Sequence, residues 1–536
     1  MRKMLLILGT LLLLASVVFA SGDQDGSGAT GDRVTLTMFG GQLATVECLD
    51  SPCNEMTTFY EEKFNVNIEW IAVPQEGKRD KQQLLLASGD YPPIFWNGDF
   101  TNADQMRYGG EGVLVPLNPL VSKAPNLEAA FKLKPYFKPA ITTPDGNIYS
   151  LPHFEECYHC SVAQKAWINT EWLDVLGLDM PTTPDELETV LMAFKNGDPN
   201  GNGKQDEIPW TGTGSEWWHG YIYDYIMNAF IYNDGDRFLS MENGKVGFSA
   251  NKPEWRDGLR YMARLYEKGL MDPQGFTQND ASAQALANQD PVIVGAYTAG
   301  HNRMYPREED NWQKYRAIPP LRGPNGVQFS GFYPGGVGGG KFAITDKATQ
   351  EEIDAVWPMV DYSYTQEGTI IQLFGLQENS DGDKWWRWAE DGELGLNGKQ
   401  AIYLSYPEIW ETVLRHTDWG MELFFWHADL FNGWAADQDI TSIEGYERYL
   451  VLESDLYIPY VPDETVPQRL YFGSEDNQRL AQFRTEIESY VRQNTAAFIT
   501  GQKNVEADWN SYVTGFKGLG LEDYLALTQK SVDSAK

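Results

Sequence analysis

Asp198, Asn200 and Asn202 place oxygen-bearing side chains at alternate positions, and Gly203 follows them directly. A hard cation such as Ca²⁺ takes about six to eight oxygen ligands, and a short loop bends around one ion only where a small residue makes the sharp turn. The spacing therefore predicts a structural calcium loop, in which Lys204 contributes its backbone carbonyl.

The predicted loop departs from the EF-hand pattern at its twelfth position. Pro209 stands there, and proline cannot supply the usual bidentate carboxylate. Asp206 and Glu207 must therefore complete the ligand shell. The alternative is an ordinary turn, because Asn, Asp and Gly dominate turns for reasons unrelated to metal.

The four cysteines form two close pairs in the sequence, Cys48 with Cys53 and Cys157 with Cys160. Three pairings are possible, and the two local ones are favoured because disulfides are the default in an oxidising compartment. The alternatives are a four-cysteine zinc site and a redox-active Cys-x-x-Cys. A redox motif should open a helix after a strand, whereas this one is expected in a loop.

The N-terminus has the features of an export signal. Arg2 and Lys3 precede an apolar run from Met4 to Phe19, and small residues lead to a cleavage site near Ala20. No cysteine follows the run, so we expect a soluble periplasmic or extracellular protein without a lipid anchor. No later apolar run reaches the roughly 18 residues that a membrane span needs.

The composition indicates a large acidic protein. Loss of Arg2 and Lys3 with the signal would change the formal net charge from −34 to −36, which disfavours nucleic acid and anionic lipid as partners. The mature length is too great for one core and predicts two lobes. The 18 Trp, 28 Tyr and 25 Phe exceed what packing alone requires and suit a protein that stacks rings on sugars.

The first part of the mature chain predicts an α/β fold. After a Gly/Ser/Asp linker at 21–32, strands at 34–39, 66–71 and 93–96 alternate with helices near 56–64 and 79–87. This alternation is typical of a parallel sheet with crossover helices. Ligands of such sheets bind beyond the carboxyl ends of the strands.

The clearest helix of the second α/β region begins at Thr183, whose hydroxyl can cap it while Glu186 reaches back. Leu187, Val190, Leu191 and Phe194 then form one apolar stripe, and Gly197 is expected to end the helix. Leu480, Phe483, Ile487, Tyr490 and Val491 predict another amphipathic helix. The calcium loop would join the first of these helices to the chain leading to Trp210.

Several segments resemble the extracellular solute-binding proteins of ABC sugar importers, in particular the alginate-oligosaccharide-binding and lipoprotein-type members. The resemblance covers nearly the whole mature chain. The segments that show the resemblance are Asp145–Pro152, Trp167–Leu178, T-T-P-D-E-L, the D-P-N-G-N-G-K-Q-D-E-I-P loop, Trp255–Pro273 and F-I-T-G with Trp509 and Tyr512. It departs from the family in lacking a lipobox cysteine and in the insertion Phe154–Cys160.

The resemblance implies a two-lobed periplasmic-binding-protein fold of type II, in which a sugar lies between lobes that close about a hinge. The expected lobes are 33–152 with about 338–395, and 153–337 with about 396–536. The expected partners are an oligosaccharide and the ABC permease, and the expected state is a monomer. Calcium-bearing members of the family match Asp198, Asn200, Asn202, Lys204, Asp206 and Glu207 position by position.

A sugar site needs flat aromatic platforms and a few fixed polar groups. The candidates are Trp96, Asp99, Trp217, Trp218, Tyr297, Trp426 and Trp434. For each aromatic residue the alternative is core packing. Trp385, Trp386 and Trp388 stand before an Asp391-Gly392 turn and predict a hairpin, which ranks below Trp217 and Trp218 as a platform.

The run Gly335–Lys341 nearly spells a phosphate-binding loop, but Phe342 replaces the hydroxyl that would hold Mg²⁺. We interpret it as a crossing between lobes. No short motif marks a catalytic residue, so a secreted glycosidase or lyase is the less favoured alternative, and a chemoreceptor partner is a third.

The net charge favours neutral oligosaccharides over polyanions. Two local basic segments, at 131–138 and at Lys78 with Arg79, would reverse this preference if they lined the cleft.

Overall fold

The computed structural model describes residues 33–214, 220–307, 311–333, 335–406, 415–420, 423–472 and 474–534. The predicted signal peptide and the linker up to residue 32 lie outside this range. Within it, none of the helices is both long enough and apolar enough to span a bilayer.

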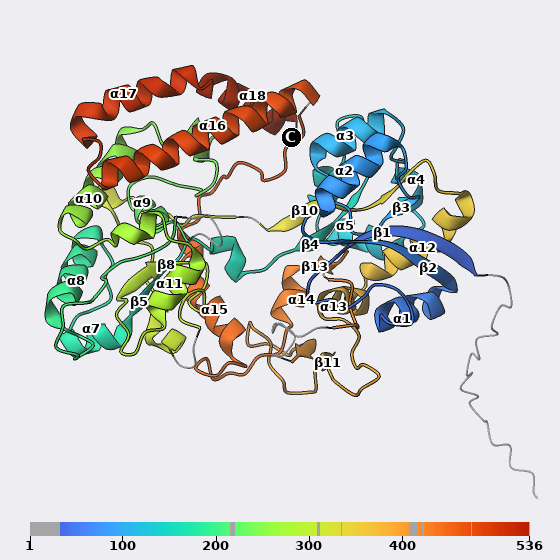
Figure 1. The fold of residues 1–536 in the computed structure, drawn as a ribbon, viewed down its shortest axis with the longest axis horizontal. Coiled ribbons are helices and arrows are strands. Elements are labelled where there is room, and N and C mark those ends of the chain that lie inside the picture. Colours follow the sequence, from blue (N-terminus) through green and yellow to red (C-terminus); the bar gives the residue numbers. More distant parts are fainter. Residues whose placement is uncertain are drawn as a thin grey trace, which may run out of the picture. The chain divides into compact units, whose positions relative to one another are not determined.

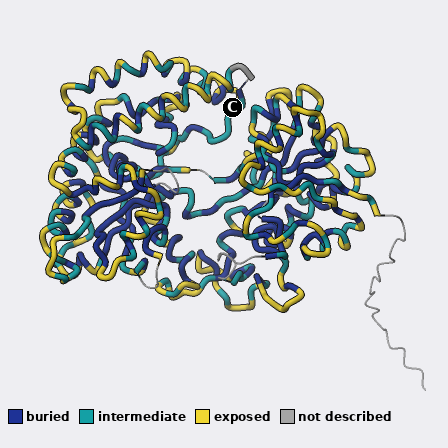
Figure 2. Tube along the Cα trace, in the orientation of Figure 1, coloured by how far each residue is buried: buried dark blue, intermediate teal, exposed yellow. Residues whose placement is uncertain are grey.

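Residues 34–536 form one compact unit that contains two large hydrophobic cores. The buried residues in Figure 2 follow the strands and the inner faces of the helices around them. We call the residues around the core that includes Leu36 and Trp96 the first lobe, and those around the core that includes Trp167 and Trp210 the second lobe. The predicted two-lobed α/β class is confirmed.

The first lobe is built on a six-stranded mixed sheet with the order β13-β4-β10-β3-β1-β2. β1 (Val34–Gln42) pairs in parallel with β2 (Val66–Pro74) and β3 (Ile94–Phe95). β10 (Gly336–Ile344) returns from far along the chain and runs antiparallel to both β3 and β4 (Leu151–Glu155). The predicted parallel alternation therefore holds for the first three strands.

Helices and a small hairpin cover this sheet (Figure 1). The remaining elements of the first lobe are α1 (Glu55–Phe64), α2 (Lys78–Ser88), α3 (Asn102–Gly110), α4 (Asn118–Val121), α5 (Pro125–Leu133), α6 (Phe137–Ile141), α12 (Gln350–Ser363), α13 (Gln366–Phe374), β11 (Trp386–Trp388), β12 (Tyr403–Ser405), β13 (Phe425–Trp426) and α14 (Ala428–Asn432).

The second lobe contains the three-stranded antiparallel sheet β8-β5-β9 and the hairpin β6-β7. Its elements are η1 (His159–Val162), β5 (Ala166–Asn169), α7 (Thr170–Leu176), α8 (Pro184–Gly197), α9 (Asp224–Met227), β6 (Leu239–Glu242), β7 (Lys245–Phe248), α10 (Pro253–Glu267), η3 (Pro273–Phe276), α11 (Asp280–Ala287), β8 (Ala296–Thr298), η4 (Asn311–Lys314), β9 (Tyr315–Ala317), η5 (Pro324–Gly326), α15 (Tyr446–Ser454), η7 (Ile458–Tyr460), α16 (Ser474–Ile499), α17 (Val505–Gly518) and α18 (Leu521–Ser534). In Figure 1, α16 to α18 (red) lie together beside α10.

Helix α8 begins at the predicted cap. The Thr183 hydroxyl accepts a hydrogen bond from the Glu186 amide, and the stripe from Leu187 to Phe194 is buried. The Glu186 carboxylate reaches the Thr182 amide rather than that of Thr183. The helix also includes Gly197, and Asp198 takes the left-handed conformation at its end, with φ 46°. The helix therefore ends at Gly197, as predicted.

The chain passes between the lobes at three places. Cys157 belongs to the first core and Val162 to the second, Phe332 packs on the second core and Val337 on the first, and a last passage separates Ala436 from Ile440. The segment 396–436 packs in the first lobe through residues such as Tyr403 and Trp434. The predicted division placed this segment in the second lobe, because no pattern in the sequence marks the last passage.

The glycine-rich segment 335–341 enters β10, as the interpretation of a crossing requires. Gly336 has a φ of 121°, which favours glycine. A Cβ on Gly338 would lie 2.3 Å from Nε2 of His153 on the neighbouring strand. Glycine is thus needed here because β4 and β10 approach closely.

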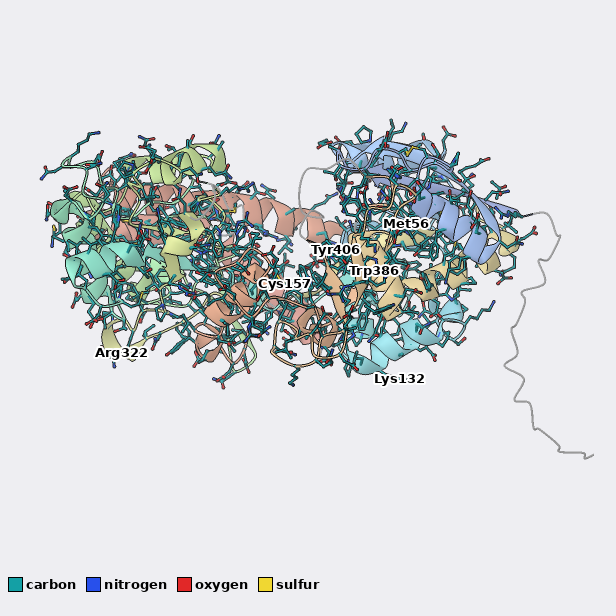
Figure 3. The ribbon with its side chains drawn as sticks, turned by 90° about the horizontal axis from the view of Figure 1, so that it is seen from below. Met56, Lys132, Cys157, Arg322, Trp386 and Tyr406 are labelled. Atoms are coloured by element: carbon teal, nitrogen blue, oxygen red, sulfur yellow. A yellow bond between two sulfur atoms is a disulfide. The ribbon has the colours of Figure 1, made fainter. Side chains whose placement is uncertain are left out.

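The tryptophan-rich segment forms a hairpin with a longer connection than predicted. β11 pairs with β12, so 14 residues from Ala389 to Ile402 separate the strands instead of the short turn at Asp391 and Gly392. Trp386, labelled in Figure 3, is buried in the first core, whereas Trp388 is 41% exposed.

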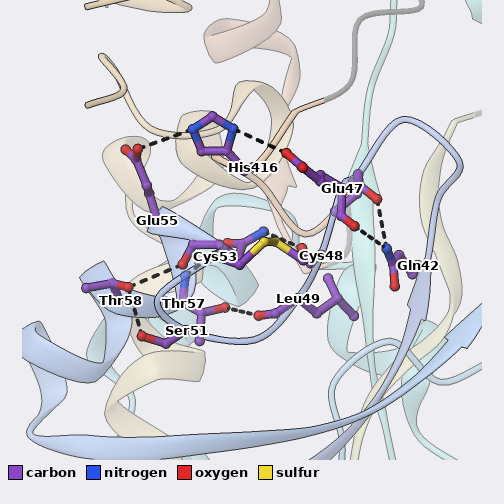
Figure 4. The surroundings of a disulfide bond; sticks show 12 residues. Gln42, Glu47, Cys48, Leu49, Ser51, Cys53, Glu55, Thr57, Thr58 and His416 are labelled. Carbon is purple, nitrogen blue, oxygen red and sulfur yellow. Dashed lines mark hydrogen bonds and ion pairs between the residues drawn. A yellow bond between two sulfur atoms is a disulfide. The ribbon is translucent and has the colours of Figure 1, made fainter. Parts of the chain in front are cut away.

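A disulfide joins Cys48 to Cys53 just before α1 (Figure 4). Asn54 caps the helix by accepting from the Thr57 amide, and its side-chain amide donates to the carbonyls of Cys48 (2.8 Å) and Asp418 (2.9 Å). His416 lies 3.2 Å from the Glu55 carboxylate. Asn54 and Glu55, which directly follow the disulfide, therefore connect the start of α1 to a distant part of the first lobe.

We expect the double variant Cys48→Ser/Cys53→Ser to lose about 2 kcal/mol of unfolding free energy, because a short loop is no longer closed in the unfolded chain. Urea denaturation measures the loss. Ligand affinity should stay unchanged, since neither cysteine lines the site described below. A denaturation midpoint equal to that of the wild type would contradict the prediction.

Candidate functional site

Two adjoining cavities, of about 670 Å³ and about 600 Å³, lie between the lobes. Both are lined by Tyr333, Val337, Gly338, Gln468 and Arg484, so they adjoin, and we call the two cavities together the groove. Its walls come from β4 and α3 of the first lobe and from α9 and α16 of the second. A groove of this size accommodates a small organic ligand.

His153 on β4 lies at the floor of the groove. Its ring stacks on Phe424 with centroids 5.1 Å apart, and its Nδ1 is buried without a hydrogen-bond partner among the described residues. Burial, together with the charges of the nearby Lys341 and Arg469, lowers the pKa of His153 to about 3. The imidazole is therefore neutral at physiological pH and can both donate and accept a hydrogen bond.

Four carboxylates line the larger cavity, and two of them already have partners. Both oxygens of Asp236 accept from Nη2 of Arg484, at 2.8 and 2.7 Å. Oδ1 of Asp234 accepts from the amides of Asp236, Arg237 and Phe238. These two side chains therefore hold the wall of the groove in place.

The other two carboxylates of the groove are Glu155 and Asp224. Glu155 ends β4, and its carboxylate has no hydrogen bond or ion pair with the described residues; burial raises its pKa. Asp224 begins α9 and is 1% exposed. Its Oδ1 accepts from Asn233 at 2.9 Å, whereas its Oδ2 has no partner among the described residues.

Two tyrosines add flat surfaces to the groove. Tyr333, which is 50% exposed, lines both cavities. Tyr221 lines the larger one, and the Arg492 guanidinium lies 4.1 Å from its ring centroid. Partly exposed rings beside hydroxyl-binding groups are the features that a sugar site needs.

A strap formed by residues 466–472 borders the groove and contacts both lobes. Arg237 of the second lobe donates to the carbonyls of Val466 and Pro467. Asn102 of the first lobe donates to the Leu470 carbonyl and accepts from Arg469 at 2.6 Å. The strap therefore ties the two walls together at one end of the groove.

The structure places most of the predicted sugar-binding aromatic residues in the cores. Trp96 packs edge-on against Tyr60, Phe342 and Trp419 and is fully buried. Tyr297 is likewise fully buried, between Tyr305 and Tyr315. Both rings are enclosed by other aromatic side chains, so they offer no face to the groove, and core packing accounts for them.

Of the remaining candidates, Asp99 lines the smaller cavity of the groove. Trp426 is buried in the first core and donates to the Tyr403 hydroxyl. Trp434 is 7% exposed and borders a separate cavity of about 820 Å³ with Arg303 and Tyr446. Trp217 and Trp218 lie outside the described residues.

Sequence reasoning missed Glu155, Asp224, Tyr221 and Tyr333, because they come from three separate segments. Neither Glu155 nor Asp224 stands in a local pattern that marks it as a groove residue. The two basic segments do not line either cavity of the groove. Lys78 bonds to Asn97 at 2.7 Å, and Lys134 pairs with Glu156 at 2.6 Å.

The second disulfide, Cys157 to Cys160, also lines the groove. Cys157, labelled in Figure 3, follows strand β4, and Cys160 lies in the short helix η1. The two predicted local pairings are thus confirmed. Because both sulfurs are bonded to each other, they leave no thiolate for the zinc alternative, although His159 lies 3.6 Å from Cys157.

The predicted metal loop joins α8 to the sheet of the second lobe. Asp198 Oδ2 accepts from the Gly203 amide at 3.0 Å, and Asn202 Oδ1 accepts from the Lys204 amide at 2.8 Å. Asn200 donates to the Val292 carbonyl at 3.3 Å. None of the loop residues lines the groove, so the loop has a structural position.

The carboxylates of this loop have buried oxygens without partners. Oδ1 of Asp198 and both carboxylate oxygens of Glu207 make no hydrogen bond within the described chain. Burial raises the pKa of Glu207, and the charges of Asp206 and Asp198 raise it further. Unpaired, mutually repelling carboxylate oxygens are the donor set that a hard divalent cation neutralises, so these residues fit such an ion.

Residues 55–375, more than half of the chain, match the family model of the bacterial extracellular solute-binding proteins. The chain belongs to this family. The groove between the two lobes is the candidate site for the solute of this solute-binding protein.

Known relatives agree with this assignment. The solute-binding protein is 31% identical over 496 residues to the fructooligosaccharide ABC transporter substrate-binding protein FusA of Streptococcus pneumoniae serotype 4. The aligned region covers 88% of this chain and 85% of FusA. The structure of FusA in complex with kestose matches with a TM-score of 0.75 at 28% identity, over 93% of this chain and 99% of that one. A FusA EF-hand mutant in complex with fructo-nystose matches with a TM-score of 0.72 at 27% identity, over 93% and 99% of the two chains.

A more distant structure shares the fold. The HMO-binding, ABC-transporter-associated solute-binding protein of Bifidobacterium longum infantis matches with a TM-score of 0.78 at 20% identity, over 94% of this chain and 99% of that one.

Proposed function

We propose that this solute-binding protein captures a neutral oligosaccharide in the groove and delivers it to the permease of an ABC transporter. The observation that carries the proposal is a groove with partly exposed tyrosines and unpaired acceptors, in a chain 31% identical to a fructooligosaccharide-binding protein. Tyrosine rings stack on the apolar faces of sugar units, and the polar groups bind the hydroxyls.

Closure of the lobes would couple capture to delivery. The three passages between the cores, together with the strap, are the connections about which the lobes would rotate. A ligand that contacts both walls stabilises the closed form by its differential affinity for that form. The permease would then recognise the closed form. We infer that the protein is exported and acts as a monomer.

We further propose that Ca²⁺ binds the loop 198–207. Asp198, Asn200, Asn202, Asp206 and Glu207 would hold it through side chains, and Lys204 through its carbonyl. When bound, the ion would neutralise the loop carboxylates and so hold the exit of α8 against the second-lobe sheet. A FusA EF-hand mutant and the unpaired oxygens of Asp198 and Glu207 support this assignment.

Calorimetry on the full mature chain tests the sugar proposal, with kestose, maltotriose and trigalacturonate as ligands. We expect saturable heat with a neutral trisaccharide, no heat with the acidic one, and intact sugar by chromatography afterwards. Heat with the acidic sugar alone would overturn the neutral preference. Product formation would favour a glycosidase, because that chemistry also uses two carboxylates facing a sugar.

A further inference from the structure

Glu155 and Asp224 stand apart from the other charged groups of the groove because they come from opposite lobes and both have acceptor oxygens to spare. Asp236 is occupied by Arg484, whereas Asp234 has its Oδ1 held by three backbone amides and its Oδ2 3.6 Å from the Arg237 guanidinium. A carboxylate oxygen enclosed by protein and left without a donor costs free energy. Oδ2 of Asp224 is such an oxygen, and the half-buried Glu155 carboxylate likewise makes no hydrogen bond to the described residues.

Asp224 lines the groove beside Gly235. A Cβ built on Gly235 would lie 2.0 Å from Gln164 Nε2 and 3.3 Å from Asp224 Oδ2, so only glycine fits against these two side chains. Gly235 itself lines the groove and has a φ of 75°, which favours glycine. Asn233 fixes the other oxygen at 2.9 Å, and this bond sets the orientation of the carboxylate.

Glu155 occupies the corresponding position in the first lobe. It ends β4 opposite Gly336 of β10, which offers no side chain to cover it. Its neighbour Glu156 differs in being fully engaged: it bonds to Lys134, the Tyr136 hydroxyl and the Ala428 amide. Two adjacent glutamates thus have separate tasks, one within the first lobe and one facing the groove.

Only a hydrogen-bond donor can satisfy an ionised carboxylate. Four carboxylates line the larger cavity, and Arg484, the one Arg or Lys among its described lining residues, is already paired with Asp236. Within the larger cavity, an anionic sugar would therefore meet more carboxylates than cations. A sugar hydroxyl group supplies the missing hydrogen-bond donor without bringing a negative charge into the cavity.

Resting on the proposed function, we propose that Glu155 and Asp224 are the specificity-determining pair, which accept hydrogen bonds from hydroxyls of an uncharged sugar chain, one from each lobe. A neutral ligand that donates hydrogen bonds to both carboxylates would connect the two walls of the groove. It also explains why the groove keeps two unpaired acids instead of amides: an acid rejects carboxylate-bearing sugars, whereas an amide would tolerate them.

The variants Glu155→Gln and Asp224→Asn test the pair on the full chain, with Glu156→Gln as the matched control. These changes keep size and shape but replace a charged acceptor by a weaker, neutral one. We expect each test variant to bind the best neutral trisaccharide about 10- to 100-fold more weakly than the wild type. The control should stay within about threefold, because its carboxylate faces away from the groove.

Trigalacturonate supplies the second readout. Binding of this acidic trisaccharide should be absent in the wild type and should appear or strengthen in Glu155→Gln/Asp224→Asn. Test variants that bind the neutral sugar as well as the wild type, while melting cooperatively, would overturn the inference and leave the proposed function intact. A wild type that binds none of the sugars would overturn the proposed function itself.

Discussion

Chelation with EGTA is expected to lower the melting temperature of the solute-binding protein by about 5–15 °C relative to a sample in excess Ca²⁺. Saturation of a site at 100 to 1,000 times its Kd stabilises the folded state by about 3–4 kcal/mol, and each kcal/mol corresponds to about 2–4 °C in a domain of this size. The reason is electrostatic. Without an ion, the carboxylates of Asp198, Asp206 and Glu207 repel one another. Differential scanning calorimetry measures the shift.

Glu207→Gln sharpens this calcium experiment. The variant should lose most of the calcium-dependent shift, since it removes one charge from two buried and unpaired oxygens. Glu242→Gln is the matched control, because Glu242 is an exposed acid of the same lobe. Its calcium response should equal that of the wild type. Superimposable melting curves of the wild type in EGTA and in Ca²⁺ would contradict the proposed site.

Asp224→Asn is expected to stabilise the fold while it weakens ligand binding. Burial raises the pKa of Asp224 from 3.8 to about 7, although Arg492 and Asn233 oppose the rise and Asp234 and Asp236 add to it. Between these two values the folded chain binds more protons than the unfolded chain. The contribution of this group to stability is therefore full below pH 3.8 and is lost as the pH rises through 7.

The gain from Asp224→Asn should accordingly grow between pH 5 and pH 8, by about 1–3 kcal/mol. Urea denaturation of both proteins at the two pH values measures it, and the difference between them cancels other titrating groups. Glu156→Gln should behave in the opposite way: burial raises the pKa of Glu156, but Lys134 and Tyr136 outweigh it and lower the pKa. An equal gain at both pH values would show that the Asp224 carboxyl is not responsible.

The elements of the fold could be predicted where the signal is local. The alternation of β1, α1, β2 and α2, the cap of α8 at Thr183 and the two disulfides each depend on residues close in the sequence. The return of 396–436 to the first lobe depends on contacts with residues hundreds of positions away. No periodicity announces such contacts, so that boundary was missed.

The groove was harder to predict than the fold. In the sequence, an aromatic residue that packs in a core looks the same as one that stacks on a ligand. Trp96 and Tyr297 proved to be enclosed by other rings. The residues that do line the groove, such as Glu155 and Tyr333, have ordinary neighbours in the sequence. What they share is a place in the lining of one cavity, with an unpaired polar group or an exposed ring. Only the three-dimensional arrangement reveals this.

Helix α15 contributes Leu450 to the second core and the next residue, Val451, to the first. A rigid helix cannot move with both lobes when they rotate relative to each other. Helix α15 would therefore lie at the axis of such a rotation. A change in the size of the side chain at position 451 would then be expected to change how the two lobes rest against each other. Substitutions at position 451 would thereby change the affinity for a solute that this residue does not contact.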